Sequence, residues 1–265
     1  MLIAAIQMTS GADKAAHVGS AVALIRKAHS RGAQLIGLPE NFSWMGPEAD
    51  RAANAEPLNG PTLTAMSQLS KELGITLIAG SILETGAPDN RVFNTSVCFG
   101  PSGEVLATYR KIHLFDVEVN DGQTYRESAA VAPGSEVVTA QTPAGIVGLS
   151  VCYDLRFPEL YRQLTQRGSV LLSVPAAFTL ATGKDHWEVL LRARAIENQC
   201  YVFAPAQQGK HPKDRMTWGH AMVIDPWGLV VARASEGEGM AIAEMDVALL
   251  TRIRASLPAL QHRRL

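Results

Sequence analysis

Short apolar runs alternate with segments of helical spacing through the first half of the chain. Runs of this length are typical of buried strands. Two segments instead repeat apolar residues every three to four positions, and each ends beside a glycine that can close a helix, Gly32 and Gly74. The pattern therefore predicts strands over 2–8, 34–38, 75–84, 91–99 and 104–109, with helices over 13–31 and 62–73.

The second half repeats this order of elements. It predicts strands over 145–151, 169–174, 200–205, 219–224 and 229–234, with helices over 158–167 and 184–198. One turn also recurs, because Pro101-Ser-Gly103 and Pro226-Trp-Gly228 each precede a strand of alternating pattern. Two such series without a linker predict one domain over residues 1–265 with internal two-fold pseudo-symmetry. We expect an α/β fold in which two sheets pack face to face and helices cover the outer faces.

Composition and charge exclude several classes of protein. The chain has 265 residues, of which 47% are hydrophobic and 18% charged, as in a globular protein and not a disordered one. Its 24 Lys and Arg nearly balance 25 Asp and Glu, so the net charge of −1 offers no basic excess for nucleic acid. No apolar stretch approaches the roughly 18 residues that span a bilayer, and the N-terminus lacks the basic segment of a signal peptide. Three Cys make no disulfide framework, so we expect a cytoplasmic protein. From the charge and the apolar runs, we expect it to bind neither nucleic acid nor membrane.

The strongest local signal for chemistry is Cys152. It follows an apolar strand directly, and Pro158 opens a helix a few residues later. A nucleophile on a sharp turn between strand and helix is rigid, and the amides that follow it point to where an oxyanion would form. The alternative is that Cys152 is a small buried hydrophobe, as most intracellular cysteines are. Cys98 and Cys200 lie within apolar runs without such a turn, and we expect both to be core residues.

A thiol nucleophile needs a base or a cation to lower its pKa and take its proton. None of the seven histidines has distinctive spacing, so a carboxylate is the better candidate. Glu40 follows the strand at 34–38, and a charge at the end of a buried strand is costly unless it is paired or functional. Lys111 follows the strand at 104–109. The alternatives are a structural ion pair for Glu40 and an ordinary solvated side chain for Lys111.

Three motifs carry these residues, and together they resemble a known family. LPENF (38–42), YRKIHLF (109–115) and VCYDLRFPEL (151–160), in this order, resemble the motifs of the nitrilase superfamily of carbon–nitrogen hydrolases. The resemblance covers nearly the whole chain and implies a four-layer α-β-β-α sandwich. It implies that Glu40 is the general base and Cys152 the nucleophile, while Lys111 and the Tyr153 amide stabilise the oxyanion. Glu127 matches a second glutamate of the family, which would orient Lys111 and position the substrate.

The second half resembles one branch of this family, the amidases that hydrolyse deaminated glutathione. The matching segments are HWEVLLRARAIENQCYVFAPAQQGKH (186–211) and GHAMVIDPWG (219–228). This resemblance implies hydrolysis of the amide between a 2-oxoglutarate unit and cysteinylglycine, a metabolite-repair reaction. An ω-amidase that releases ammonia from 2-oxoglutaramate is the alternative, because both substrates share the acyl half. A binding module with a silent site and an acyltransferase also stay open, although the intact Glu-Lys-Cys set argues against the first.

Carboxylates are expected to guide substrate recognition, because deaminated glutathione is anionic at both ends. The polar loop 207–218 carries three cations, so Lys210 and Arg215 are candidate ligands for these carboxylates, with Lys213 as a third. The further candidates for substrate binding are Tyr153, Phe178 and Thr179.

The sequence also predicts residues that support the site, the absence of a cofactor and the oligomeric state. Asp154, Arg156 and Glu159 should form a charge network beneath the Cys152 turn, and Asn94 should brace the catalytic loops. No Cys-x-x-Cys, His-Glu-x-x-His or phosphate-binding loop occurs, so neither a metal nor another cofactor is expected. Apolar residues on more than one face of helix 184–198 favour a homodimer that pairs through this region.

Overall fold

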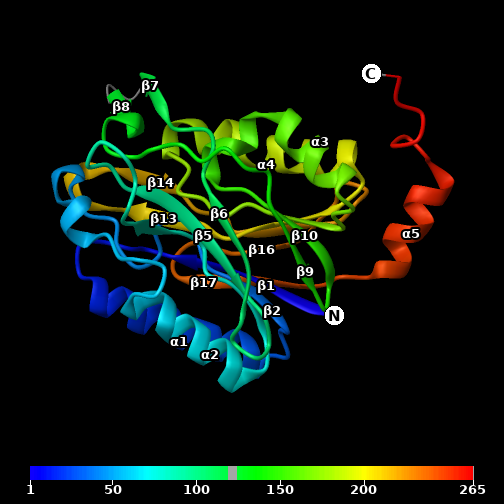
Figure 1. Cartoon of the computed structure of the whole chain (residues 1–265). Coiled ribbons are helices and arrows are strands. Elements are labelled where there is room, and N and C mark those ends of the chain that lie inside the picture. The colour runs from blue at the N-terminus through cyan, green and yellow to red at the C-terminus, as the bar shows by residue number, and fades with distance from the viewer. Residues whose placement is uncertain (119–123, 265) are drawn as a thin grey trace.

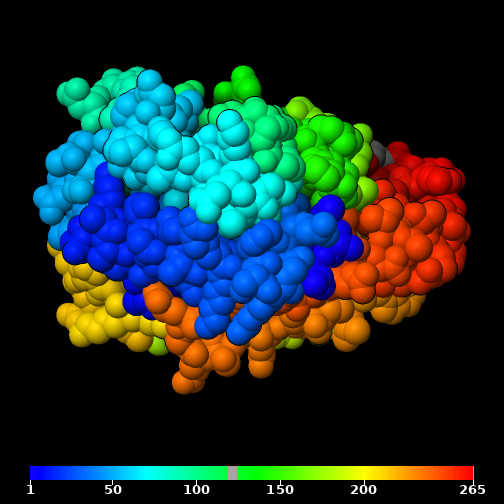
Figure 2. Space-filling model, turned by 90° about the horizontal axis from the view of Figure 1, so that it is seen from below, coloured from blue at the N-terminus to red at the C-terminus, as the bar shows by residue number. Residues whose placement is uncertain are grey.

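Two β-sheets lie face to face in the middle of the molecule, and helices cover the outer side of each (Figure 1). The computed structural model describes residues 1–118 and 124–264, so Leu265, the end of the expected domain, lies outside it. Figure 2 shows α1 (Lys14–Ser30) and α2 (Pro61–Leu73) side by side over one outer face. The expected α-β-β-α sandwich is confirmed. Its four covering helices are α1 (Lys14–Ser30), α2 (Pro61–Leu73), α3 (Pro158–Gln166) and α4 (Leu180–Asn198).

The first sheet has nine strands among the described residues, in the order β14-β13-β1-β2-β3-β5-β4, with β17 paired to β1 and β6 to β5. The expected strand 75–84 is two strands, because the chain turns at Gly80, where φ is 43°. A Cβ there would lie 2.0 Å from the Pro39 carbonyl oxygen, so only glycine fits. The strands are β1 (Leu2–Met8), β2 (Leu35–Gly37), β3 (Thr76–Ile78), β4 (Ile82–Glu84), β5 (Phe93–Phe99), β6 (Val105–Arg110), β13 (Ala206–Lys210), β14 (Met216–Trp218) and β17 (Gly239–Glu244).

The second sheet has six strands within the described ranges, in the order β16-β15-β12-β11-β10-β9. They are β9 (Thr139–Thr142), β10 (Gly145–Leu149), β11 (Leu171–Ser173), β12 (Tyr201–Ala204), β15 (Met222–Ile224) and β16 (Val230–Arg233). A separate two-stranded ribbon, β7 (Asp116–Glu118) with β8 (Thr124–Arg126), and the helix α5 (Val247–Ser256) lie outside the two sheets (Figure 1). No helix of the described chain is long and apolar enough to cross a membrane.

The strand pairing repeats between the two halves, as the sequence predicted. In each half, three parallel strands are followed by two antiparallel ones: β1-β2-β3 then β5-β6, and β10-β11-β12 then β15-β16. An antiparallel strand also flanks the first strand of each half, β17 beside β1 and β9 beside β10. The two recurring turns join β5 to β6 and β15 to β16, so the duplication extends to these hairpins.

Alternation along β1 shows how the layers are held together. Ile3 and Ala5 belong to the apolar core between the sheets, whereas Ala4 and Ile6 pack into the core under α1 and α2. The sheets are in close contact at Gly37, where an added Cβ would lie 2.3 Å from the Phe203 ring. This close contact keeps the ends of β2 and β12 together, and the residues after β2 carry Glu40.

A buried histidine attaches the β13–β14 hairpin to the start of the chain. The Nδ1 atom of His211 lies 2.7 Å from the Ser10 carbonyl oxygen, and its Nε2 atom lies 2.7 Å from the Thr217 hydroxyl oxygen. A neutral imidazole satisfies both, because one ring nitrogen donates and the other accepts. Burial lowers the pKa of His211 to about 4, so this link is uncharged at neutral pH.

We predict that His211 makes the fold sensitive to acid. Its folded-state pKa lies below the ordinary value of 6.5, so the unfolded chain binds more protons between these values. The stabilisation is complete above about pH 6.5 and is lost as the pH falls toward 4, by up to about 3 kcal/mol. Urea unfolding of wild type and His211→Gln from pH 7 to pH 4 should show a smaller pH-dependent loss in the variant. His29→Gln, at an exposed position of α1, is the control. Equal slopes in all three proteins would contradict the prediction.

Candidate active site

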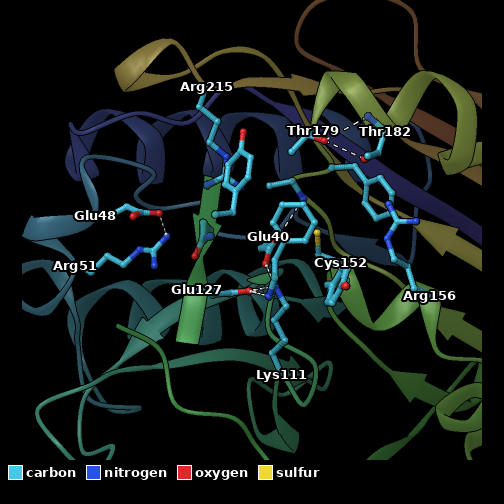
Figure 3. Close-up of a pocket in the computed structure, with 16 residues that line it drawn as sticks. Glu40, Glu48, Arg51, Lys111, Glu127, Cys152, Arg156, Thr179, Thr182 and Arg215 are labelled. Atoms are coloured by element: carbon cyan, nitrogen blue, oxygen red, sulfur yellow. Dashed lines mark hydrogen bonds and ion pairs between the residues drawn. The ribbon is translucent and has the colours of Figure 1, made fainter. Parts of the chain in front are cut away.

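One pocket gathers the residues of all three motifs (Figure 3). The pocket and its mouth enclose about 510 Å³. Glu40, Lys111, Glu127 and Cys152 line it together, although they come from distant parts of the chain. The expected substrate-binding residues that also line it are Tyr153, Phe178, Thr179 and Arg215.

The Lys111 ammonium lies between two carboxylates at the centre of this pocket. Its Nζ atom is 3.0 Å from Glu40 Oε1 and 2.8 Å from Glu127 Oε2. The Lys111 and Glu40 side chains are 2% and 3% exposed, so this is a buried ion pair and not a surface one. An unpaired charge at this depth would be strongly destabilising, so each group depends on the others.

One strand residue and two loop amides fix both carboxylates. Asn94, on β5, donates from Nδ2 to Glu40 Oε1 at 2.8 Å and to Glu127 Oε1 at 3.3 Å. The Ala177 amide donates to the other Glu40 oxygen at 2.9 Å, and the Phe115 amide donates to Glu127 Oε2 at 2.7 Å. The expected bracing role of Asn94 matches these contacts, since it connects the two acids.

The charged groups of the site shift one another's pKa values, because little solvent reaches them. Burial alone would raise the pKa of Glu40, but the Lys111 ammonium and a hydrogen bond with Cys152 outweigh it and leave the pKa below its ordinary value. Burial would lower the pKa of Lys111, yet Glu127 and Glu40 raise it. Burial and the Glu40 charge together raise the pKa of the Cys152 thiol, against the effect of Lys111. The resting site therefore holds a neutral thiol beside an ionised carboxylate.

Cys152 occupies a strained turn between β10 and a 3₁₀ helix (Cys152–Arg156). Its φ of 51° lies in the left-handed region, which costs a non-glycine residue on the order of 1–2 kcal/mol. Its amide donates to the Pro175 carbonyl oxygen at 2.9 Å, so this N–H is already occupied. The next amide in the chain is that of Tyr153, the backbone donor that the family resemblance assigns to the oxyanion.

Asp154 holds this turn in place from beneath. One carboxylate oxygen accepts from the Val151 amide at 2.8 Å and from the Tyr109 hydroxyl at 2.7 Å. The other lies 3.0 Å from the amide nitrogen and 2.7 Å from the ring Nδ1 of His113. Asp154 thus supports the Cys152 turn, as the sequence predicted, and it also joins this turn to the Lys111 motif.

The rest of the predicted charge network is wrong. Glu159 is exposed, and Arg156 lies at the pocket wall with its guanidinium carbon 5.2 Å from the Phe178 ring centre. The cation that does support the turn is Arg194 of α4, which donates from Nε and Nη2 to the Leu155 carbonyl oxygen at 3.1 and 2.7 Å. This role of Arg194 could not be predicted from the helical spacing of α4, because Arg194 lies among its apolar residues.

The segment 207–218 is a hairpin, not the loop that composition suggested. Strands β13 and β14 pair in antiparallel fashion, with Lys210 opposite Met216. Arg215 comes just before β14, next to Met216, the residue that pairs with Lys210. Lys210 is 68% exposed and pairs with Asp214, and it does not line the pocket, whereas Arg215 does. Lys213 is exposed at the turn.

Several pocket residues escaped sequence reasoning. Arg156 and Tyr125 lie close to motif residues in the sequence, and Thr182 lies in the first turn of α4, so their positions were a partial signal for the pocket. Glu48 begins a short 3₁₀ helix and Arg51 lies between this helix and the next, a segment with no repeating pattern, so no sequence signal distinguished them. Within the described residues, no group of three or more His, Cys, Asp or Glu side chains has the arrangement of a metal site.

Comparisons with known proteins agree with the fold and the site. The carbon–nitrogen hydrolase family model matches residues 2–255. A deaminated glutathione amidase from Synechocystis sp. is 47% identical over 265 residues, which covers 99% of this chain and 97% of that protein. The omega-amidase NIT2 of Homo sapiens is 39% identical over 262 residues, 99% of this chain and 94% of that protein.

A solved structure shows the same architecture. The crystal structure of the C. elegans NitFhit protein matches with a TM-score of 0.93 and 40% identity, covering 99% of this chain and 65% of that one. The family match over nearly the whole chain and the identity to full-length relatives lead to one conclusion: the chain belongs to the carbon–nitrogen hydrolase family, the nitrilase superfamily, and is an enzyme that hydrolyses carbon–nitrogen bonds.

Proposed function

We propose that this enzyme hydrolyses deaminated glutathione to 2-oxoglutarate and cysteinylglycine. The observation that supports this most is the buried Lys111, held between two carboxylates beside a thiol in a pocket that arginines also line. The relatives named for this activity are also more similar to the chain than the omega-amidase is. Hydrolysis of 2-oxoglutaramate is the second candidate, since the omega-amidase is similar along the whole chain and the two substrates share their acyl half.

Acylation begins with the neutral thiol. Glu40 accepts the proton of Cys152 as the sulfur attacks the amide carbonyl carbon, which forms the carbon–sulfur bond and places negative charge on the carbonyl oxygen. Lys111 and the Tyr153 amide stabilise this oxyanion, a contribution worth roughly 100- to 1000-fold in rate for a single donor. Because Glu40 is ionised and hydrogen-bonded to the thiol before attack, the proton has a short path.

Breakdown of the tetrahedral intermediate uses the same acid. Glu40 returns its proton to the amide nitrogen as the carbon–nitrogen bond breaks, and cysteinylglycine leaves as a neutral amine. Glu40 then takes a proton from water that attacks the thioester, and the departing sulfur recovers a proton. Glu127 keeps Lys111 in place through both steps, so its role is to position the cation and the substrate. No step requires a metal, because Lys111 and a backbone amide supply the positive charge.

The substrate assignment is tested by parallel assays. Purified enzyme, with EDTA present, should hydrolyse deaminated glutathione with a higher kcat/KM than 2-oxoglutaramate, and simple nitriles should react more slowly than either. A preference for 2-oxoglutaramate would make the protein an ω-amidase. An inactive enzyme with an unreactive Cys152 would instead favour the binding module, and transfer to added amines in preference to water would favour an acyltransferase.

The role of Glu40 is tested by Glu40→Gln, which keeps the shape of the side chain but removes the base. We expect turnover to fall by roughly 10²- to 10⁴-fold. Mass spectrometry of the variant after exposure to deaminated glutathione should show either unmodified protein or a 2-oxoglutaryl adduct confined to Cys152. Cys152→Ala should abolish both turnover and adduct, while Cys98→Ala, at a buried thiol of β5, is the matched control. Normal turnover by Glu40→Gln would place the base elsewhere, with Glu127 next.

A homodimer is part of this proposal. Exposed apolar side chains gather where α4 meets the β15–β16 turn, with Val189 66%, Ile196 51%, Trp227 63% and Leu229 61% exposed. Ile196 packs against Gly228, and Arg192 donates to the Gly228 carbonyl oxygen, so these elements form one surface. The equivalent turn of the first half carries Ser102 and Glu104 instead of tryptophan and leucine. The apolar character is therefore particular to the second half, as expected for a face that pairs with a second copy.

We predict that charge on this face dissociates the dimer. Light scattering at micromolar concentration should give twice the chain mass of 28.4 kDa for wild type and the single mass for Val189→Asp/Leu229→Asp. Val105→Asp is the matched control, since Val105 is 60% exposed on the corresponding strand of the first half. A wild-type mass of 28.4 kDa, or a double variant that stays dimeric, would reject pairing through this face.

A cytoplasmic location completes the proposal. All three cysteines are buried free thiols, and a thiol nucleophile stays reduced most readily in a reducing compartment.

A further inference from the structure

Arginines stand on opposite sides of Cys152 in the pocket. In Figure 3, Arg51 and Arg215 lie to one side of the sulfur and Arg156 to the other. A substrate whose scissile amide sits at Cys152 must extend in both directions, one for the acyl part and one for the leaving group. The two sets of cations therefore face different ends of the substrate.

Arg51 has unused hydrogen-bonding capacity. Its side chain is 13% exposed, and its Nη2 atom lies 3.1 Å from Glu48 Oε1. Its Nη1 atom is buried and has no hydrogen-bond partner within the described residues. Glu48 is itself 54% exposed, so this pairing is weak and solvent-screened. A buried guanidinium nitrogen without an acceptor, at the wall of a pocket, is suited to an anionic ligand.

Arg215 has the same feature on the neighbouring wall. Its Nε atom is buried without a partner among the residues that the structure describes. Its guanidinium carbon lies 5.7 Å from the centre of the Tyr125 ring, which holds the plane of the side chain in place. The His211 amide donates to the Arg215 carbonyl oxygen at 2.8 Å, so the buried histidine also fixes the backbone from which Arg215 extends.

The position of Glu40 decides which end these two arginines face. In the mechanism proposed above, Glu40 gives its proton to the amide nitrogen, so the leaving group must depart on the side of Glu40. Figure 3 shows Glu40 between Cys152 and Arg51. Arg215 is also close enough to Glu40 to help lower the pKa of that carboxyl. The leaving group thus extends toward Arg51 and Arg215, and the acyl part extends the other way.

We propose that Arg51 and Arg215 form a subsite for the carboxylate of the leaving group, which in deaminated glutathione is the glycine carboxylate. This inference rests on the proposed function, because it assumes a leaving group that is an anionic dipeptide. Arg51 is the specificity-determining residue that sequence reasoning missed. It separates a substrate with such a carboxylate from 2-oxoglutaramate, whose leaving group is ammonia.

The experiment varies the charge on the enzyme and on the substrate together. Three substrates share the 2-oxoglutaryl group: deaminated glutathione, its derivative with glycinamide in place of glycine, and 2-oxoglutaramate. The enzymes are wild type, Arg51→Ala, Arg51→Lys and Lys210→Ala. Lys210 is the matched control, because it removes one exposed cation of the β13–β14 hairpin outside the pocket. Arg215→Ala is less informative, since it also perturbs Glu40.

Arg51→Ala should lower kcat/KM for deaminated glutathione about 10- to 100-fold relative to 2-oxoglutaramate, the size of a charge-assisted hydrogen bond. Wild type should discriminate against the glycinamide derivative by a similar factor, and Arg51→Ala should not. Arg51→Lys should recover part of the ratio, because the charge remains without the planar fork. Lys210→Ala should keep the wild-type ratio.

Two different failures are distinguishable. If wild type hydrolyses deaminated glutathione but Arg51→Ala keeps the wild-type ratio between substrates, the subsite is wrong and the proposed function stands. If wild type hydrolyses only 2-oxoglutaramate, both are overturned. A variant that is merely misfolded loses activity on every substrate equally, so the ratio and the response to the glycinamide derivative still report on Arg51.

Discussion

The site depends on one buried cation, the Lys111 ammonium between Glu40 and Glu127. A lysine that is 2% exposed is stable as an ammonium in this position only because it lies between two carboxylates. The same arrangement keeps Glu40 ionised and able to accept a proton, although burial opposes its charge. Each carboxylate in turn needs the Asn94 amide and a backbone N–H to fix its orientation. Losing Lys111 would leave two buried carboxylates without a cation between them, so the geometry and the protonation of the site are set together.

The strained turn at Cys152 is the second requirement, and the rest of the fold holds it. The left-handed φ is maintained from three directions: Asp154 binds the turn from beneath, Pro175 accepts the Cys152 amide, and Arg194 holds the 3₁₀ helix that comes next. Since Asp154 also binds the segment after Lys111, the sulfur and the ammonium are positioned by one shared carboxylate. Rigid support of this kind lets the oxyanion donors stay in place during the reaction.

Local patterns encode the features that the sequence predicted well. Runs and motifs of a few residues predicted the strands, the helices, the duplication and the set of Glu40, Lys111, Glu127 and Cys152. The pocket brings these four residues together. The sequence missed the strands β7, β8, β9 and β17 and the helix α5, because their partly exposed residues form weak patterns. Two cations were not predicted correctly: Arg51 lines the pocket without having been predicted, and Lys210 was predicted to bind substrate but is exposed outside the pocket. Whether a cation faces a pocket or solvent depends on the path of the turns and irregular loops that carry it, which residue spacing does not reveal.

The duplication also explains why one end of the molecule carries the chemistry. Leu38-Pro39-Glu40 after β2 corresponds to Val174-Pro175-Ala176 after β11 in the second half. These equivalent segments meet across the sandwich, where the Ala177 amide donates to Glu40, while within the second half the Pro175 carbonyl oxygen accepts from the Cys152 amide. The first half thus supplies the charged groups, and the second supplies the nucleophile and the backbone that orients them. Two series with one strand order have diverged in the segments after their strands, so neither half contains a complete site and the contact between the sheets becomes a condition for catalysis.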